Sequence, residues 1–284
     1  MENMQVTRKQ HFLPEMYLKN FTDENGKLWK RDLKYGTYKQ ATPAQTGYRE
    51  FLYETRWKNP PNMEKQFALL NYLENHFSSR ENIYSQCIES VCQKICLGNS
   101  DISSITTDEK EILAEFTTNI FLRHPNMMGQ MELDKVSQEE MNNYHANELI
   151  ALFGSEAETV MLFLKKCEWL DSQFSGGYFQ TVQREFENMC LTFLVSSGAE
   201  FISCDWPIIY AHIDGKIICF LLPLTPKCCV SYNVFLKKEN VDFISDDMVR
   251  LYNKLHIEKK SSRMNYLYAH RKEDIEVLFE KGDE

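Results

Sequence analysis

The sequence predicts an α+β fold, and three observations lead to this prediction. Strand-like segments gather near both ends of the chain, in residues 1–58 and 178–284, whereas a helical pattern fills residues 62–174. Helices and strands that are separated along a chain are typical of α+β proteins rather than of alternating βα units. The 284 residues, 43% of them hydrophobic, suffice for one core, so we expect a single domain over 1–284 whose terminal β segments share one sheet.

The N-terminal region is expected to be built from short strands. The segment HFLPEMYLKNF at 11–21 is predicted to form a strand that ends in a packed corner. In the following DENGKLWKRDL, the pair Asn25-Gly26 is a typical turn of a β-hairpin. Residues from Gly36 to Trp57 read as extended or loop structure, and Pro60 and Pro61 exclude a helix at that point.

The middle of the chain carries helix starts, helix stops and an apolar stripe. Three pairs fit the S/T-x-x-E capping box, in which a hydroxyl and a glutamate satisfy backbone N–H groups at a helix start. These pairs are Thr106 with Glu109, Ser137 with Glu140, and Ser155 with Glu158. Apolar residues at helical spacing are Ile112, Leu113, Phe116, Ile120 and Phe121. Gly98 and Gly154 are predicted helix ends, and Pro125 should end the helix that carries Arg123.

The C-terminal region begins after the SGGY break at 175–178. The segment MCLTFLVSS fits either a strand or a helix, whereas residues 201–226 predict a hairpin that turns at Asp214-Gly215. KCCVSYNVFL is expected to be a third strand, SDDMVRLYNKLHIEKK a capped helix and RMNYLYAH a closing strand.

Composition excludes some classes of protein. The 32 basic and 41 acidic residues give a net charge of -9, which argues against a dominant basic surface for nucleic acid. The first 20 residues lack the apolar core of a signal peptide, and no apolar run approaches the roughly 20 residues of a membrane span. Nine cysteines without paired spacing indicate free thiols. We therefore expect a cytoplasmic protein with no membrane partner.

Several blocks of the chain together resemble one family. HFLPEMYLKNF at 11–21 resembles the opening H-[YF]-[VI]-P-x-x-Y-L-x-x-F of the DUF4238 family, a prokaryotic domain of unknown function. GKLWKRD is similar to the short hairpin of that family, and RHP at 123–125 to its R-T-P. FISCDWPIIY, FLLPLTP and VRLYN resemble three later blocks, in the same order. The resemblance covers essentially the whole chain and implies a shared fold without an established activity.

This sequence departs from the family pattern at three positions. Cys204 stands where the family usually has serine, Trp206 where it has asparagine, and His124 where it has threonine. If the family serine were a nucleophile, its replacement by Cys204 would change the chemistry. We therefore do not include Cys204 among the predicted site residues.

Three polar residues at the family landmarks are candidates for catalysis. His11 is either a ring that satisfies nearby backbone or an acid, base or metal ligand. Asp205 lies between the apolar pairs Phe201-Ile202 and Ile208-Ile209, where a carboxylate must be paired or hydrated; it is either a structural cap or part of a site. Arg123 either meets the exposed carbonyls at a helix end or binds a phosphate or carboxylate group, and it is the natural partner of Asp205.

The predicted substrate contacts are Asn253, Tyr17 and Glu64. Asn253 lies on an amphipathic helix and could equally be a buried cross-link, while an acid such as Glu64 is favourable at any helix start. Cys92 and Cys96 share a helical face, which favours core thiols over a metal site. Because GxxxxGK[ST], GxGxxG, HExxH and GxSxG motifs are all absent from the sequence, the common nucleotide, zinc and serine-hydrolase sites are not expected.

Two functions of different class are therefore expected. In the first, His11, Arg123, Asp205 and Asn253 converge on one cleft and hydrolyse a phosphate-containing substrate such as RNA, DNA or a nucleotide, with a divalent metal such as Mg²⁺ as a candidate cofactor. Such a protein would suit a toxin or antiphage effector, by analogy alone. In the second, the same residues form a structural network in a non-catalytic module that binds or senses through a protein partner or a second copy. An open pocket at these residues favours the first reading, and a closed network favours the second.

Overall fold

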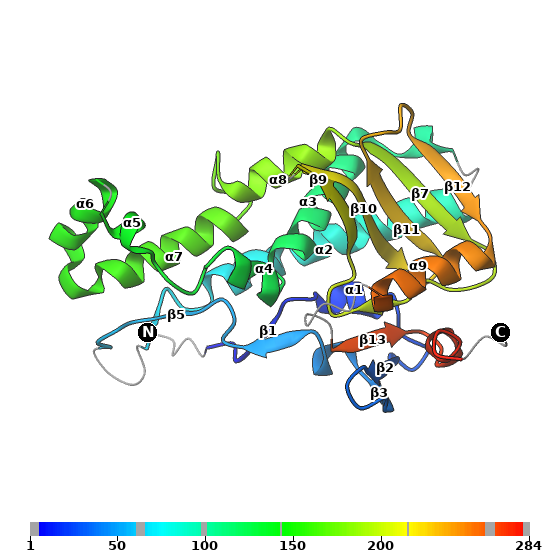
Figure 1. Ribbon diagram of the computed structural model, residues 1–284, viewed down its shortest axis with the longest axis horizontal. Coiled ribbons are helices and arrows are strands. Elements are labelled where there is room, and N and C mark those ends of the chain that lie inside the picture. Colours follow the sequence, from blue (N-terminus) through cyan, green and yellow to red (C-terminus); the bar gives the residue numbers. More distant parts are fainter. Residues whose placement is uncertain are drawn as a thin grey trace. The chain divides into compact units, whose positions relative to one another are not determined.

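The α+β prediction is confirmed in a computed structural model of the chain (Figure 1). The structure describes residues 6–60, 66–97, 101–142, 144–214, 216–258 and 265–280. It divides the chain into two compact units, each assembled from three separate segments. Unit 1 comprises residues 1–12, 48–80 and 118–183, and unit 2 comprises residues 13–47, 81–117 and 184–284. The chain passes between the units five times, after residues 12 and 47 and within the helices α2 (Tyr72–Cys92), α3 (Thr107–Leu122) and α8 (Tyr178–Glu187).

Unit 1 combines two short strand pairs with helices. The pairs are antiparallel, β1 (Lys9–His11) with β4 (Tyr48–Glu50) and β5 (Thr55–Arg56) with β6 (Phe67–Ala68). Its helices are α4 (Pro125–Gln130), α5 (Gln138–Met141), α6 (Tyr144–Phe153) and α7 (Ala157–Leu170), together with parts of α2, α3 and α8. A short 3-10 turn, Gly154–Glu156, joins α6 to α7.

Unit 2 contains a five-stranded sheet of order β12-β7-β11-β10-β9. Its strands are β7 (Cys190–Ser196), β9 (Ile209–Ile213), β10 (Lys216–Thr225), β11 (Cys228–Asn233) and β12 (Asn240–Ile244). All neighbours are antiparallel except β12 and β7. The MCLTFLVSS segment is therefore a strand, and the predicted hairpin and third strand are confirmed as β9, β10 and β11.

Helices cover both faces of this sheet within unit 2. Helix α9 (Asp246–Glu258) lies beside the sheet (Figure 1). It buries Val249 against Leu194, Leu221 and other side chains of one face. On the opposite face, Phe186 of α8 packs against Phe220 and Tyr232. Neighbouring side chains of a strand point to opposite faces of the sheet. Because helices cover both faces here, apolar residues are buried on both sides of the sheet.

A second sheet of unit 2, of order β3-β2-β13-β8, joins the two ends of the chain. Its strands are β2 (Leu28–Asp32), β3 (Tyr38–Ala41), β8 (Ser203–Cys204) and β13 (Tyr266–Ala269). The expectation that terminal β segments share one sheet is thus confirmed for β2 and β3 with β8 and β13, whereas the other N-terminal and C-terminal strands pair in separate sheets. The hydrophobic core beside this sheet contains Ile202, Leu267 and Ile275, the last from the short helix α10 (Glu273–Glu276). Ile257 of α9 packs against this core.

The N-terminal segment differs from its prediction. Residues 11–21 are not one strand, because helix α1 (Glu15–Lys19) follows Pro14 and buries Met16, Tyr17 and Leu18. Proline is favourable at a helix start, where its missing N–H is not needed, and burial of three apolar residues stabilises even this single turn. A turn does lie at Asn25-Gly26, with Gly26 at a φ of 70°. It is not the predicted hairpin turn, because helix α1 and not a strand precedes it, and β2 pairs instead with β3 and β13.

Two of the three predicted capping boxes are confirmed. Thr106 with Glu109 and Ser137 with Glu140 exchange both expected bonds. The third prediction, Ser155 with Glu158, is wrong, because α7 begins after a 3-10 turn and has no side-chain cap.

Immediately before α7, it is the carboxylate of Glu156 that accepts backbone hydrogen bonds. It accepts bonds from the backbone N–H groups of Lys58 and Asn59, so a long-range contact prevails over the local pattern.

Two of the three predicted helix ends can be compared with the structure. Gly154 follows α6 at a φ of 55°, as expected, and α3 ends at Leu122, just before Arg123. Gly98 lies outside the described residues. Among the residues that the structure describes, no helix combines the length and hydrophobicity needed to cross a bilayer.

Candidate functional site

Arg123 is a buried member of unit 1, with 1% of its surface exposed. Its guanidinium donates to Tyr53 Oη at 3.0 Å, to Asn119 Oδ1 at 3.1 Å and to the carbonyl oxygen of His11. It also lies 4.2 Å from the ring centroid of Phe77, a cation–π contact. These partners are neutral acceptors of the same unit, and they tie the end of α3 to β1.

His11 contributes its backbone to this network. Its carbonyl oxygen accepts from Arg123 and from Tyr53 Oη at 2.9 Å, while its ring meets that of Tyr48 edge-on at 5.7 Å. Burial, with the nearby charges of Arg123 and Lys9, lowers the pKa of His11 from 6.5 to about 4. The imidazole is therefore uncharged at neutral pH.

Asp205 caps the start of β13 in unit 2. Its carboxylate accepts from the backbone N–H groups of Asn265 at 3.1 Å and Tyr266 at 3.2 Å, and from the hydroxyl of Tyr268. Burial raises the pKa of Asp205, while the bonds from Tyr268 and Asn265 and the charge of Lys30 act in the opposite direction. The carboxylate before Trp206 and Pro207 is thus accommodated by three donors.

A chain of hydrogen bonds continues from Asp205 to a buried lysine. Thr46 Oγ1 donates to Tyr268 Oη at 2.9 Å, and Lys30 Nζ donates to Thr46 Oγ1 at 3.1 Å. The Lys30 ammonium also lies 3.4 Å from the ring centroid of Tyr266. Burial lowers the pKa of Lys30, and Asp205 opposes that shift. The network links β2, β8 and β13 of the second sheet.

The expected pair of Arg123 with Asp205 joins residues of different units, so it stays a prediction, as does the convergence of the four candidate residues on one cleft. Tyr17 is fully buried, its hydroxyl lies 3.0 Å from Ser203 Oγ, and burial raises its pKa well above 10. Glu64 lies outside the described residues.

Cys204, the departure from the family serine, is fully enclosed. Its thiol donates to the carbonyl oxygen of Trp206 at 2.9 Å and lies 3.6 Å from His256 Nδ1. Burial raises the pKa of Cys204 well above 9, so the sulfur is a protonated thiol at neutral pH.

The adjacent cysteines Cys228 and Cys229 of β11 face opposite sides of the sheet, because neighbouring side chains of a strand alternate. Cys229 packs in the core beneath α9, whereas the Cys228 thiol hydrogen-bonds with Cys92 and Cys96 of the helical layer. No group of three or more histidine, cysteine or carboxylate side chains in the described part of the chain is arranged to hold a metal ion.

Asn253 is the predicted site residue that borders a pocket described in unit 2. From α9, its amide accepts from the N–H of Ile202 at 3.1 Å and donates to the carbonyl oxygen of Glu200 at 2.8 Å. These bonds hold the segment that leaves the five-stranded sheet for β8. Asn253 is 3% exposed and thus acts as a buried cross-link. It also lies at the wall of a cavity, as a substrate contact would.

The pocket has a volume of ≈ 590 Å³ and is polar. Beside the loop Gly198–Ala199 and Val277, its walls carry six charged side chains. These are the carboxylates of Glu200, Asp246, Glu273 and Asp274 and the guanidinium groups of Arg250 and Arg271. Cavities of this size hold small molecules or single side chains of a partner.

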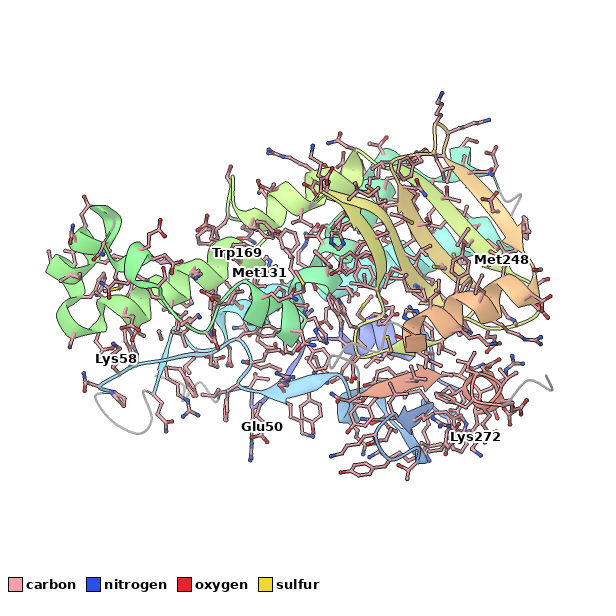
Figure 2. All side chains as sticks on the ribbon, viewed as in Figure 1. Glu50, Lys58, Met131, Trp169, Met248 and Lys272 are labelled. Carbon is pink, nitrogen blue, oxygen red and sulfur yellow. The ribbon has the colours of Figure 1, made fainter. Side chains whose placement is uncertain are left out.

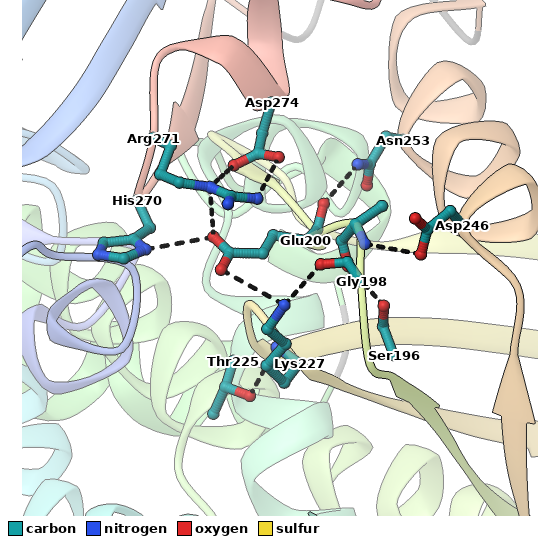
Figure 3. Close-up of polar contacts among 11 residues, drawn as sticks. Ser196, Gly198, Glu200, Thr225, Lys227, Asp246, Asn253, His270, Arg271 and Asp274 are labelled. Carbon is teal, nitrogen blue, oxygen red and sulfur yellow. Dashed lines mark hydrogen bonds and ion pairs between the residues drawn. The ribbon is translucent and has the colours of Figure 1, made fainter.

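Glu200 is the central carboxylate of the cluster in Figure 3. Its oxygens lie 3.2 Å from His270 Nδ1, 3.4 Å from Arg271 Nε and 3.5 Å from Lys227 Nζ. Arg271 in turn makes a two-pronged pair with Asp274, at 2.8 and 2.9 Å. With only 8% of its surface exposed, Glu200 is already compensated by cations.

Asp246 shapes the opposite wall at the start of α9. Its Oδ1 accepts from the N–H of Ala199 at 2.8 Å, and a Cβ at Gly198 would clash with both of its oxygens. Glycine at 198 therefore permits a close approach of loop and helix. Sequence reasoning missed Glu200, Asp246, Arg250 and Arg271, since each is an ordinary charged residue outside any recognisable spacing.

Comparison with known proteins identifies the family. Residues 9–273 match the family described as "Protein of unknown function (DUF4238)". No match was found among curated proteins or among solved structures. Because the match covers nearly all of the 284 residues, this chain belongs to the DUF4238 family.

Proposed function

We propose that this chain is a binding module, and that the polar pocket of unit 2 receives a cationic group, a guanidinium or an ammonium. The observation that carries this proposal is the charge of the lining, four carboxylates against two guanidinium groups. Both guanidinium groups already have carboxylate partners, Arg271 with Asp274 and Arg250 with Asp247 at 3.7 Å. Glu200 is likewise paired, with Arg271 and Lys227, so the negative charge offered to a ligand comes mainly from Asp246 and Glu273. A further positive charge is therefore what the lining favours.

The buried polar residues support a non-catalytic reading. Arg123 and Asp205 are 1% and 5% exposed, and each has several hydrogen-bond partners in its own unit. In this proposal they act structurally, because a buried polar group whose bonds are satisfied stabilises one arrangement of the backbone.

Hydrolysis of a phosphate-containing substrate is the second candidate. The observation in its favour is that Arg250 and Arg271 line the pocket and Lys227 lies beside Glu200. Arginine forks bind phosphate well, but here a phosphate would have to displace the carboxylates that hold Arg271. We therefore rank this function below cation binding.

Calorimetric titration of the full chain with argininamide, ATP and inorganic phosphate tests the proposal. We expect argininamide to bind and the anions not to bind. The double variant Asp246→Asn/Glu273→Gln, which removes two pocket charges and keeps the shape of both side chains, should weaken binding about tenfold.

A matched control removes two carboxylates that do not line the pocket, Asp242→Asn and Glu276→Gln. Equal weakening in both double variants would mean that only the net charge of -9 attracts the probe, and it would overturn the proposed site. Binding of phosphate or turnover of ATP, with no heat from argininamide, would favour the hydrolase.

A further inference from the structure

The pocket of unit 2 continues into a second hollow along α9. This hollow, of ≈ 510 Å³, shares Arg250 and Val277 with the pocket, so the two form one groove. Its remaining lining comes from α9 and from the residues that follow α10. These are Asp247, Leu251, Lys254, Leu278 and Glu280. A groove with two adjoining hollows suits an extended ligand better than a single small molecule.

The second hollow differs from the first in its apolar surface. Leu251 of α9 is 47% exposed, although it belongs to the groove, and Val277 and Leu278 are half-buried beside it. Met248 lies on the same helix (Figure 2). It is 39% exposed, although it is not among the residues that line the hollow. Exposed apolar side chains within a polar rim are typical of surfaces that bind a partner's side chain.

The charged side chains that line the groove favour a positively charged partner. Asp247 and Glu280 add two carboxylates to the four of the pocket, whereas Lys254 adds one ammonium to Arg250 and Arg271. Carboxylates thus outnumber cations by six to three in the groove of a chain whose net charge is -9. Such a field attracts basic partners and repels acidic peptides and nucleic acid.

We infer that the groove binds a segment of a partner protein in which a lysine or arginine is closely followed by an apolar residue. The basic side chain enters the pocket beside Asp246 and Glu273, and the apolar residue packs on Leu251 and Leu278. This inference rests on the proposed cation site and adds the class of its ligand. Recognition needs both halves of the groove, because an exposed charge pair alone gives little affinity.

Fluorescence anisotropy with three labelled peptides of equal length tests the inference on the full chain. The first contains an arginine followed two positions later by a leucine, the second has serine in place of that leucine, and the third has glutamate in place of the arginine. We expect the leucine peptide to bind about fivefold to tenfold more tightly than the serine peptide, and the glutamate peptide not to bind.

Variants of the protein locate the effect. Leu251→Ser should abolish the advantage of the leucine peptide and leave the affinity of the serine peptide unchanged. Leu236→Ser is the matched control, since Leu236 is 45% exposed in unit 2 and lies outside the groove. It should leave all three affinities as in the wild type.

The outcomes separate the two proposals. Equal binding of the leucine and serine peptides, with none of the glutamate peptide, would overturn this inference and leave the cation site standing. An advantage of leucine that survives Leu251→Ser would also overturn the inference, because the apolar contact would then lie elsewhere. Failure of all three peptides to bind would overturn this inference, whereas the calorimetric titration with argininamide decides independently whether the cation site stands.

Discussion

Replacement of Asp205 by alanine separates a structural carboxylate from a catalytic one. The carboxylate accepts from two backbone N–H groups at the start of β13 and from the hydroxyl of Tyr268, and it offsets the buried charge of Lys30. Asp205→Ala leaves all three donors without that acceptor, in a site where the residue is 5% exposed.

The magnitude follows from these three bonds. A hydrogen bond to an ionised acceptor contributes about 1.5 kcal/mol or more, so the loss of three costs about 4–5 kcal/mol. Removal of a buried charge returns part of this, about 1–2 kcal/mol, because the desolvation penalty of Asp205 disappears with it. We expect the free energy of unfolding to fall by about 3 kcal/mol, which corresponds to a melting temperature lower by on the order of 10 °C.

Urea unfolding of the full chain, followed by circular dichroism, measures this change. Asp242→Ala is the control, since Asp242 is an exposed aspartate of unit 2, and it should stay within about 0.5 kcal/mol of the wild type. Asp205→Asn, which keeps an acceptor oxygen, should lie between the two. A loss below about 1 kcal/mol in Asp205→Ala would refute the structural account of this residue.

Three further predictions follow from other contacts. Because the pKa of His11 falls from 6.5 to about 4 on folding, the unfolded chain binds the proton first, so the contribution of His11 to stability should drop by roughly 3 kcal/mol between pH 6.5 and pH 4. Urea titrations at both pH values should show a smaller drop in His11→Phe, and an equal drop would contradict the assignment. Gly198→Ala should displace Asp246 from the Ala199 N–H and cost about 1–2 kcal/mol, with a smaller cost in an Asp246→Ala background; additive costs in this double-mutant cycle would disprove the contact. Asn253→Leu should cost about 2–4 kcal/mol, since two buried backbone groups lose their partner, and an unchanged thermal melt would exclude the cross-link.

Much of the fold could be predicted from local patterns. Two capping boxes and the hairpin through Asp214 depend on neighbouring residues, and each has the expected form. Asn25-Gly26 forms a turn as its residues favour, but not the turn of a hairpin, because strand pairing depends on distant segments. The sheet shared by both ends of the chain could be expected because each end supplies strands that need partners. The segment at 190–196 became a strand only through pairing on both sides, which no local window contains.

The candidate site was much harder to predict. The blocks that resemble the family drew attention to Arg123 and Asp205, but polar residues in apolar surroundings fit a buried network as well as an active site. Glu200 and Arg271 lie 71 positions apart and meet only because β13 returns beside the loop after β7. Charges of this kind are indistinguishable from ordinary surface residues until the fold brings them together.

The central claim is that the acidic pocket beside Asn253 binds a cationic group. Calorimetric titration with argininamide, comparing Asp246→Asn/Glu273→Gln with Asp242→Asn/Glu276→Gln, tests it most directly because both double variants lose the same charge. The account predicts about tenfold weaker binding in the pocket variant and wild-type affinity in the control. Equal affinities in the two variants, or no binding to the wild type, would contradict it.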